Sequence, residues 1–303
     1  MSKRNQQARD INGVVLLDKA SGSSSNYVLQ KVKRLFGAKK AGHTGSLDPL
    51  ASGLLPICLG QATKVAQFLL DDDKRYLVRA KFGQISSTGD SEGKIENFGS
   101  TKGVDESSIK NILLQFLGDI NQVPPMYSAL KRNGTPLYKL ARKGIEIQRS
   151  PRPVTVYEIN FLGLKESVVS LEVFCSKGTY IRTLVEDIGK SLGCGGYVVE
   201  LRRTGFAHLN LSESKTYDQL SKLKEQNLQS LDSVILNADE ILPKLKSLYL
   251  NSEQTRDIRL GKKIEYQGFS TSQKLKLYDQ NKQFLGIGES NLVSEILPSR
   301  LFV

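Results

Sequence analysis

The sequence is poor in the residues that build metal centres and disulfide frameworks. Its three cysteines, Cys58, Cys175 and Cys194, lie far apart and form no Cys-X-X-Cys pair, which argues against a disulfide framework or a zinc site. His43 and His208 are the only histidines, so a histidine-rich metal site is excluded. We therefore expect a protein without a bound metal.

Long apolar segments and nucleotide-binding signatures are also missing. No apolar run reaches the roughly 18 residues of a membrane-spanning helix. Residues 1–10 are polar and lack the apolar core of a signal peptide, so we expect a flexible tail there and a soluble, cytoplasmic protein. Neither a P-loop motif nor the glycine motif of a dinucleotide-binding unit is present.

Negative charge is in short supply. The chain has 43 Lys and Arg against 31 Asp and Glu, a formal net charge of +12. A field of this sign favours a polyanionic partner, with nucleic acid as the first candidate and an anionic membrane surface as the second. The length of 303 residues suggests about two domains.

Residues 42–54 combine one imidazole, one carboxylate and several small residues. Their glycines permit turns and the close approach of another molecule. Pro49 keeps Asp48 out of helical geometry, so the carboxylate is presented on a loop of restricted shape. On spacing alone, an ordinary Asp-Pro turn is the more frequent explanation.

Hydrophobic periodicity predicts a mixture of strands and helices. Strands are expected at 13–17, 54–59, 74–82, 149–164, 168–175 and 197–206, and helices between the serines at 21–25 and Gly37 and at 60–70, 105–117, 136–143 and 179–192. Residues 208–246 are polar and irregular, and we interpret them as a domain connection. Residues 247–303, with one helix at 252–260 and short strands broken by glycines, suit a small barrel.

Two tyrosines and one arginine are further candidates for a site. Tyr76 is either a core aromatic or a ring that stacks on a planar ligand, and Tyr180 is as readily core as ligand-facing. Arg182 lies at the margin of the apolar stripe of its helix. An ion pair with Glu186 at i+4 has the less favourable orientation and is worth at most a few tenths of a kcal/mol, so it is a weak reason for Arg182.

The chemistry that these residues offer is narrow. Hydrolysis of a glycoside needs two carboxylates, and Asp48 has no obvious partner. No Ser/His/Asp or Cys/His set can be assembled. An aspartate can act as a nucleophile, a nearby arginine would keep it ionised, and an aromatic ring can stack on a base taken out of its helix. The pattern fits chemistry on one nucleobase of a nucleic acid, without cofactor or metal.

A resemblance to a known family sharpens this interpretation. Residues 42–53 closely resemble the nucleophile motif of bacterial tRNA pseudouridine-55 synthases. Further segments resemble motifs of that family in matching order and spacing over about 11–207, namely 17–19 with 22–26, 74–76, 124–129, 178–184 and 201–203. Residues 247–303 resemble the small RNA-binding PUA domain that follows this catalytic domain. Ala20, Ser46 and Tyr197 depart from the usual Pro, Ala and His, and none of them removes a presumed catalytic group.

The resemblance implies an α+β pseudouridine synthase fold over 11–246, with a central mixed, largely antiparallel sheet flanked by helices. A small β-barrel-like PUA domain at 247–303 would follow. The implied reaction is isomerisation of the T-loop uridine (position 55) of tRNA to pseudouridine by an isomerase that needs no cofactor. The implied partner is the T-arm of tRNA, with no membrane and no protein partner, and we expect a monomer.

The resemblance also implies catalytic roles. Asp48 would be the nucleophile, or the base that withdraws a ribose proton, and the sequence does not choose between these. Tyr76 would stack on the flipped base and could assist removal of the C5 proton. Arg182 would pair with Asp48 and help to hold the backbone.

Other residues would bind the substrate. His43 would fill the space vacated by the flipped nucleotide, its alternative being a loop-stabilising hydrogen bond. Tyr180 and Leu201 would line the uracil pocket. The candidates for contacts to the RNA backbone are Lys19, Lys31, Lys39, Lys40, Lys64, Arg142, Arg202 and Arg203.

Three functions are weighed. The leading one is an enzyme acting on tRNA. The second is an RNA-binding or RNA-folding protein for which Asp48 is incidental, and both could hold for one protein. A hydrolase using Asp48 on a small substrate is disfavoured by the +12 charge and by the C-terminal unit.

Overall fold

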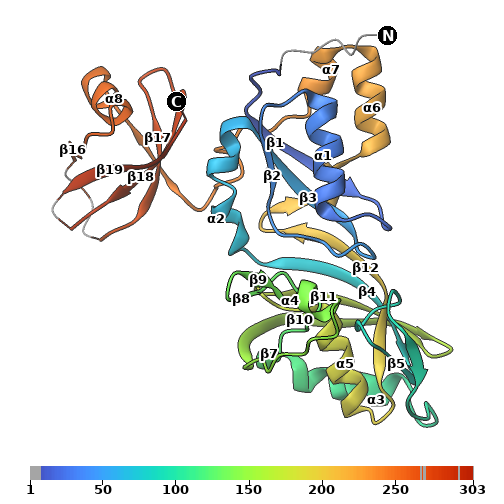
Figure 1. Cartoon of the computed structure of the whole chain (residues 1–303). Helices are drawn as coiled ribbons and strands as arrows, with labels where there is room; N and C mark the ends of the chain where they lie inside the picture. Colours follow the sequence, from blue (N-terminus) through green and yellow to red (C-terminus); the bar gives the residue numbers. More distant parts are fainter. Residues whose placement is uncertain (1–7, 267, 269–270, 293, 303) are drawn as a thin grey trace.

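The computed structural model describes residues 8–266, 268, 271–292 and 294–302. One long sheet runs through the larger part of the molecule, and a second, smaller sheet stands beside it (Figure 1). In the described part of the chain, no helix has the length and apolar character needed to cross a membrane.

The large sheet is mixed and largely antiparallel. Eight strands follow one another in space as β14 (Lys215–Thr216), β1 (Gly13–Lys19), β3 (Ser52–Leu59), β12 (Gly196–Phe206), β4 (Lys74–Phe82), β11 (Val168–Cys175), β10 (Arg152–Lys165) and β7 (Gly118–Gln122), while β2 (Ala41–His43) pairs with β3 and β13 (Leu209–Asn210) with β12. Only the β1–β14 and β12–β3 pairs are parallel. The predicted α+β class and the mixed sheet are confirmed.

Helices cover the two ends of this sheet. Near β1 lie α1 (Ser25–Phe36), α6 (Tyr217–Gln226) and α7 (Leu228–Asp232), and near β10 lie α5 (Ile181–Ser191) and α3 (Glu106–Leu113) (Figure 1). The remaining short elements are η1 (Gly60–Lys64), α2 (Gln67–Leu70), β5 (Gln84–Ser86), β6 (Ile95–Asn97), η2 (Leu114–Phe116), β8 (Lys131–Arg132), β9 (Thr135–Pro136), α4 (Leu137–Ala141) and η3 (Leu211–Glu213).

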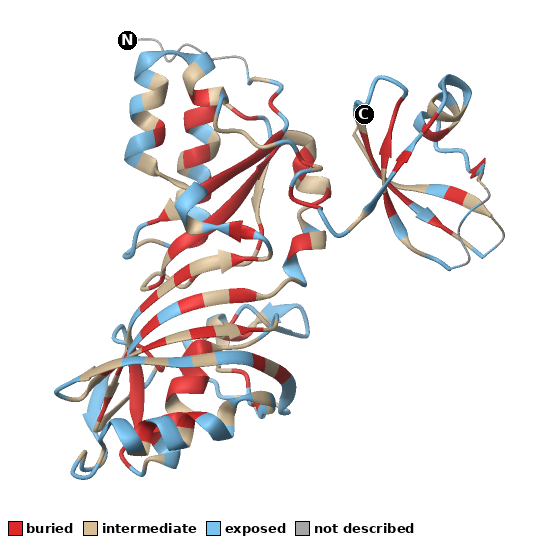
Figure 2. Cartoon of the chain, turned by 180° about the vertical axis from the view of Figure 1, so that it is seen from behind, coloured by how far each residue is buried: buried red, intermediate tan, exposed pale blue. Residues whose placement is uncertain are grey.

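Local sequence explains several of these elements. The N-cap Ser24 of α1 accepts a hydrogen bond from the Tyr27 amide, and Gly37 ends the helix at φ 66°, where a Cβ would be unfavourable. The expected strand at 74–82 is present as β4, along which buried and more exposed residues alternate (Figure 2). Tyr76 and Val78 are among its buried residues.

Two predictions about local structure were wrong. The helix expected at 60–70 is split into η1 and α2, neither of which has a side-chain cap hydrogen bond at its start. The stretch expected to be irregular at 208–246 contains α6, which Thr216 and Gln219 begin with a capping box. The sequence of α6 is mostly polar, and Leu220 is its single fully buried residue. The apolar pattern was therefore too sparse to predict a helix.

The small sheet is formed by the C-terminal residues. Its order is β15 (Lys246–Tyr249), β17 (Lys274–Tyr278), β18 (Phe284–Ser290), β19 (Glu295–Leu301) and β16 (Ile264–Glu265), with α8 (Ser252–Arg259) beside it. It has a core of its own, and it also joins the core of the large sheet through Ile287, Phe284 and Phe302. The Lys64 ammonium adds a hydrogen bond to the Leu301 carbonyl at 2.7 Å.

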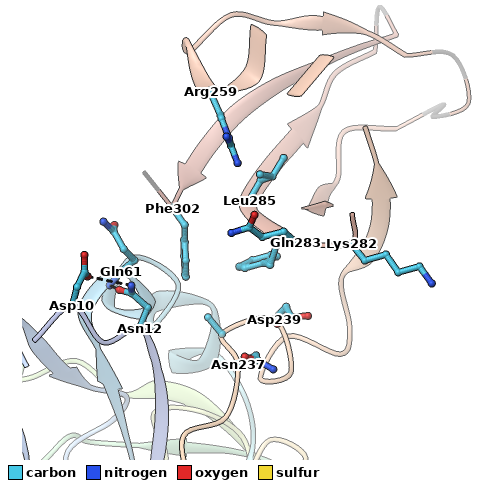
Figure 3. A pocket seen from close by; sticks show the side chains of 12 residues that line it. Asp10, Asn12, Gln61, Asn237, Asp239, Arg259, Lys282, Gln283, Leu285 and Phe302 are labelled. Atoms are coloured by element: carbon cyan, nitrogen blue, oxygen red, sulfur yellow. Dashed lines mark hydrogen bonds between the residues drawn. The ribbon is translucent and has the colours of Figure 1, made fainter. Parts of the chain in front are cut away.

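A polar cleft of about 560 Å³ lies where the two sheets meet (Figure 3). Asp10, Asn12 and Gln61 line one side of it, and Arg259 and Phe302 reach in from the C-terminal unit. The cleft is at the Gly13 end of β1, whereas Pro49 and Gly53, on either side of Ala51 and close to Asp48 in sequence, are tied to the Lys19 end. A strand of this length separates the two regions by roughly 20 Å.

Candidate active site

A second cavity, of about 310 Å³, is bounded by residues 45–51, β4, β12, the start of α5 and residues 127–129. Five of the six residues predicted from the motifs line it: Asp48, Tyr76, Tyr180, Arg182 and Leu201. They come from segments up to 153 positions apart in the sequence. His43 is not among the lining residues.

Asp48 and Arg182 form the charged pair at the centre of the cavity. Arg182 Nη2 lies 2.9 Å from Asp48 Oδ2. The arginine side chain is 6% exposed and the aspartate side chain 45%. Because α5 begins at Ile181, the Arg182 side chain projects from the first turn of a buried helix, which fixes where the guanidinium lies. The expected pairing is therefore present in the fold.

Arg182 has further partners that hold it in place. Its Nη1 donates to the Thr88 carbonyl at 2.9 Å, its Nη2 donates to the Tyr127 carbonyl at 2.7 Å, and Asp90 Oδ2 lies 3.5 Å from Nη1. Asp90, which the sequence suggests is an ordinary turn residue, is 2% exposed. Nothing in a Ser-Ser-Thr-Gly-Asp stretch signals this role, because the ion pair joins residues 92 positions apart.

Burial raises the pKa of the Asp48 carboxyl above its ordinary value, and the Arg182 charge opposes that rise. The neighbouring charge of Asp90 raises the pKa further, while Lys19 lowers it. The carboxylate thus lies in a site that disfavours its charge except where cations compensate. A carboxyl whose pKa is shifted by burial and by specific charged neighbours in a cavity is a candidate for a functional group.

Lys19 holds the loop at residues 42–54 in place, which corrects the prediction that it contacts the RNA backbone. Lys19, expected at the RNA backbone, is 1% exposed. Its ammonium donates to the carbonyls of Ala20 at 2.9 Å, Ser23 at 2.7 Å and Pro49 at 3.4 Å. Burial lowers its pKa to about 8. An ammonium enclosed by carbonyls is not available to a phosphate, so its role is to fix the loop that carries Asp48.

Arg203 requires the same correction. It was expected at the RNA backbone, but it is 1% exposed and donates to the Leu54 carbonyl at 2.8 Å and the Gly45 carbonyl at 3.1 Å. It therefore clamps both ends of the loop. Ser25 adds a third tie, since its Oγ donates to the Leu47 carbonyl and accepts from the Leu47 amide, both at 2.8 Å.

Tyr76 and Leu201 supply the apolar wall. Each is 8% exposed, and they come from the adjacent strands β4 and β12. Burial raises the pKa of the Tyr76 phenol to about 12, which keeps it protonated near neutral pH. Lys74, which begins the same strand and also lines the cavity, has its pKa lowered to about 8 by burial. Lys74 was not among the predicted site residues, although it lies on the same face of β4 as Tyr76.

Tyr180 and His43 are positioned by backbone contacts. The Tyr180 amide donates to Gln122 Oε1 at 2.9 Å, and the Gln122 amide donates to the Tyr180 carbonyl at 3.3 Å. His43 pairs with Ile57 across β2 and β3, and its Nδ1 is buried without a hydrogen-bond partner. Burial and the Arg203 charge lower the pKa of His43, which favours its neutral form.

The other basic candidates divide by exposure. Lys39, Lys40 and Arg142 are exposed. Lys31 packs over the Tyr217 ring at 3.9 Å, and Arg202 pairs with Asp18 at 2.7 Å. The Lys64 ammonium already donates a hydrogen bond to the C-terminal unit. Within the described residues, no group of three or more His, Cys, Asp or Glu side chains is arranged to hold a metal ion.

The mixed sheet thus presents one aspartate on a clamped, glycine-rich loop, paired with an arginine and walled by a tyrosine and a leucine, as the resemblance to pseudouridine synthases implies. Family models support this along nearly its whole length. The TruB family pseudouridylate synthase N-terminal domain matches residues 33–181, the tRNA pseudouridylate synthase B C-terminal domain matches 182–243, and the pseudouridine synthase II TruB C-terminal model matches 247–302.

The chain belongs to the TruB family of pseudouridylate synthases. It is 48% identical over 303 residues to tRNA pseudouridine synthase B of Actinobacillus pleuropneumoniae serotype 5b, covering 99% of each chain. It is also 48% identical over 289 residues to tRNA pseudouridine synthase B of Haemophilus influenzae strain Rd, covering 95% of this chain and 92% of that protein. Pseudouridine synthases are isomerases, so the predicted family and enzyme class are confirmed.

The fold has counterparts among solved structures. An H/ACA RNP bound to a substrate RNA containing 2′-deoxyuridine matches with a TM-score of 0.73 at 22% identity, covering 96% of this chain and 85% of that one. An archaeal box H/ACA sRNP Nop10–Cbf5 complex matches with a TM-score of 0.72 at 22% identity, covering 99% of this chain and 89% of that one. These likenesses concern the fold, including the curled C-terminal sheet.

Proposed function

We propose that the protein isomerises the T-loop uridine at position 55 of tRNA to pseudouridine, with Asp48 as its reactive group. The relatives at 48% identity bear the name tRNA pseudouridine synthase B over nearly their full length. The observation that carries the proposal is the 2.9 Å contact between Asp48 and the buried Arg182 in a cavity lined by Tyr76, Tyr180 and Leu201.

The reaction balances without an external reagent. The C1′–N1 glycosidic bond breaks and a C1′–C5 bond forms, while C5 loses a proton and N1 gains one. No electron is gained or lost, so no redox cofactor is required. An aspartate that acts either on the nucleotide as a nucleophile or on a ribose proton as a base provides the needed chemistry, and both routes require its ionised form.

The walls of the cavity suit a uracil that has left its helix. The Tyr76 ring would stack on the base, with Tyr180 and Leu201 completing the pocket. Extruding a nucleotide costs a few kcal/mol of unstacking, which such stacking offsets. With a pKa of about 12, the Tyr76 phenol is a hydroxyl donor rather than a ready base near neutral pH, so its contribution to removing the C5 proton would pass through a hydrogen bond.

His43 and the exposed cations would hold the surrounding RNA. A neutral His43, at the root of the loop, is suited to fill the space left by the flipped nucleotide. Lys31, Lys39, Lys40, Lys64, Arg142 and Arg202 remain candidates for contacts to the backbone of the T-arm. We further propose that residues 11–246 form the catalytic domain and 247–303 a PUA-like RNA-binding domain, and that the protein acts as a cytoplasmic monomer.

Release of tritium from C5 tests this function. A tRNA transcript made with [5-³H]uridine should lose one tritium per molecule on incubation with the protein, because only the reacting C5 exchanges its hydrogen. A matched transcript with cytidine in place of the T-loop uridine should release none. Equal release from both transcripts, or no release from either, would contradict the proposed site of action.

A further inference from the structure

Two buried cations of the active cavity have no carboxylate partner. Lys74 of β4 and Arg203 of β12 both line the cavity and are 8% and 1% exposed. Lys74 Nζ lies 4.8 Å and Arg203 Cζ 5.0 Å from the centroid of the same Phe206 ring. In the described part of the chain, the acceptors of both cations are backbone carbonyls and the Tyr76 hydroxyl. Two buried like charges without a counter-ion are unfavourable, so this cluster calls for an anion.

The acidic residues whose charges act on Lys74 are engaged elsewhere. They are Asp72 and Asp73, in the turn before β4. The Asp72 carboxylate pairs with Lys244, and Asp73 Oδ1 accepts a hydrogen bond from the Tyr157 hydroxyl at 3.2 Å. Burial nevertheless lowers the pKa of Lys74 only to about 8, so the ammonium is still charged at pH 7. Its charge is therefore available to a molecule in the cavity.

Lys74 also keeps a hydrogen-bond donor, beside the place proposed for the base. Its Nζ donates to the Leu70 carbonyl at 3.1 Å and to the Asp72 carbonyl. An ammonium has three N–H donors, so within the described residues one is left over. Lys74 and Tyr76 are buried on one face of β4, and Arg203 pairs with Tyr76 across β12 and β4. Both cations therefore lie next to the ring on which the uracil would stack.

The proposed reaction generates an anion at this position. Whether Asp48 attacks C1′ or withdraws a ribose proton, the C1′–N1 bond breaks and its electron pair leaves on N1. The freed uracil then carries a negative charge that is shared by N1, O2 and O4. The ring becomes neutral when C5 bonds to C1′ and Asp48 leaves C1′ or returns its proton, after which the C5 proton is lost and N1 gains one. Fixed positive charge beside such an anion lowers the barrier to its formation.

We propose that Lys74 is a catalytic residue whose ammonium stabilises the negative charge on the uracil ring when the C1′–N1 bond breaks, with Arg203 as a fixed charge behind it. The inference rests on the proposed function, which supplies the uracil. A phosphate of the RNA backbone is the other anion to consider. The walls around the cations, Tyr76 and Leu201, are aromatic and apolar, and they suit a base better than a phosphate.

The rate of the chemical step, compared with the affinity for RNA, tests this role. Lys74→Gln keeps a donor for a carbonyl but removes the charge. With a T-arm stem-loop, its single-turnover rate should fall roughly 100-fold while Kd stays within about threefold of wild type, because the anion forms only after binding. The loss should shrink to about tenfold with 5-fluorouridine at the reacting position, because the fluorine itself withdraws charge from the ring. Chromatography of nuclease digests separates the N-glycoside from the C-glycoside and follows both substrates.

Lys81→Gln is the matched control. Lys81 lies near the other end of β4 and on its opposite face, so this variant should convert both substrates at the wild-type rate. Weakened binding by Lys74→Gln with an unchanged rate would assign Lys74 to a backbone phosphate and overturn the proposal. An equal fold loss of rate with uridine and 5-fluorouridine, the result of a merely structural role, would also overturn it.

A second variant keeps the test decisive if Lys74→Gln does not fold. Lys74→Arg keeps the charge but spreads it over a planar group, so its smaller rate loss should again be less with 5-fluorouridine than with uridine. Equal losses would overturn the proposal. A wild-type protein that leaves uridine unconverted would contradict the proposed function, whereas equal conversion by the wild type and Lys74→Gln would contradict only the role of Lys74.

Discussion

The Arg182 guanidinium lies 2.9 Å from the Asp48 carboxylate, and only the carboxylate is open to solvent. Arg182 is fixed by the Thr88 and Tyr127 carbonyls and by Asp90, so it does not depend on Asp48 for its position. Asp48 meets the arginine through Oδ2, and its side chain is 45% exposed, which leaves it accessible to a substrate. The arginine therefore acts as a rigid counter-charge for a group whose ionised form is disfavoured by burial.

The raised pKa of Asp48 predicts how the rate depends on pH. Burial disfavours the carboxylate, so the pKa is above its ordinary value and the protonated, inactive form persists to higher pH than for an exposed aspartate. The single-turnover rate should fall as pH decreases through this raised pKa and reach a plateau above it. Rates measured by tritium release from pH 4 to 8 check this. A rate that stays unchanged from pH 8 down to pH 4 would contradict this prediction.

Substitution of Arg182 should shift the acid limb of the pH–rate profile. Since the arginine charge lowers the pKa of Asp48, Arg182→Met should shift the acid limb to higher pH and reduce the plateau rate by at least about 100-fold. Arg182→Lys keeps a charge but not the fixed fork, so it should shift the limb less. Lys94→Gln, an exposed residue, is the control and should leave the profile unchanged.

Two substitutions of Tyr76 separate the role of its ring from the role of its hydroxyl. Tyr76→Ala removes both and should lower the single-turnover rate by at least about 100-fold, because loss of one base–aromatic stack is worth about 1–3 kcal/mol and the hydroxyl donor is lost as well. Tyr76→Phe keeps the ring and should lie between this variant and the wild type. An Ala variant as active as the Phe variant would show that the ring does not hold the base.

Arg203 and its neighbour Arg202 should differ sharply in their effect on stability. Arg203→Met leaves the Gly45 and Leu54 carbonyls without a buried partner and should lower the free energy of unfolding by about 2–4 kcal/mol. Arg202→Met breaks a half-exposed pair with Asp18 and should cost less than about 1 kcal/mol. Urea unfolding followed by circular dichroism measures both. Equal losses would refute the structural role given to Arg203.

The sequence was sufficient where local pattern or a motif carried the information. The pattern at 74–82 predicts the strand that β4 forms. The motifs at 42–53, 178–184 and 201–203 predict that Asp48, Arg182 and Leu201 share a site, and they line one cavity.

The sequence was insufficient where burial of a charge depends on distant segments. Lys19 and Arg203 look like surface cations, but Lys19 donates to the Pro49 carbonyl 30 positions away, in addition to nearby carbonyls, and Arg203 donates to the Gly45 carbonyl 158 positions away. The same holds for Asp90, a turn residue by composition that pairs with Arg182. No periodicity or spacing encodes such contacts, because they arise only when β1, β12 and residues 42–54 are brought together.

The most direct test of the account replaces one oxygen of Asp48 by nitrogen. Asp48→Asn preserves the size of the side chain while removing its charge, so the account predicts that single-turnover tritium release falls by at least about 1,000-fold. The affinity for unmodified tRNA, measured in parallel by filter binding, should stay within about threefold of wild type. Release at the wild-type rate by the Asn variant would contradict a reactive role for this carboxylate.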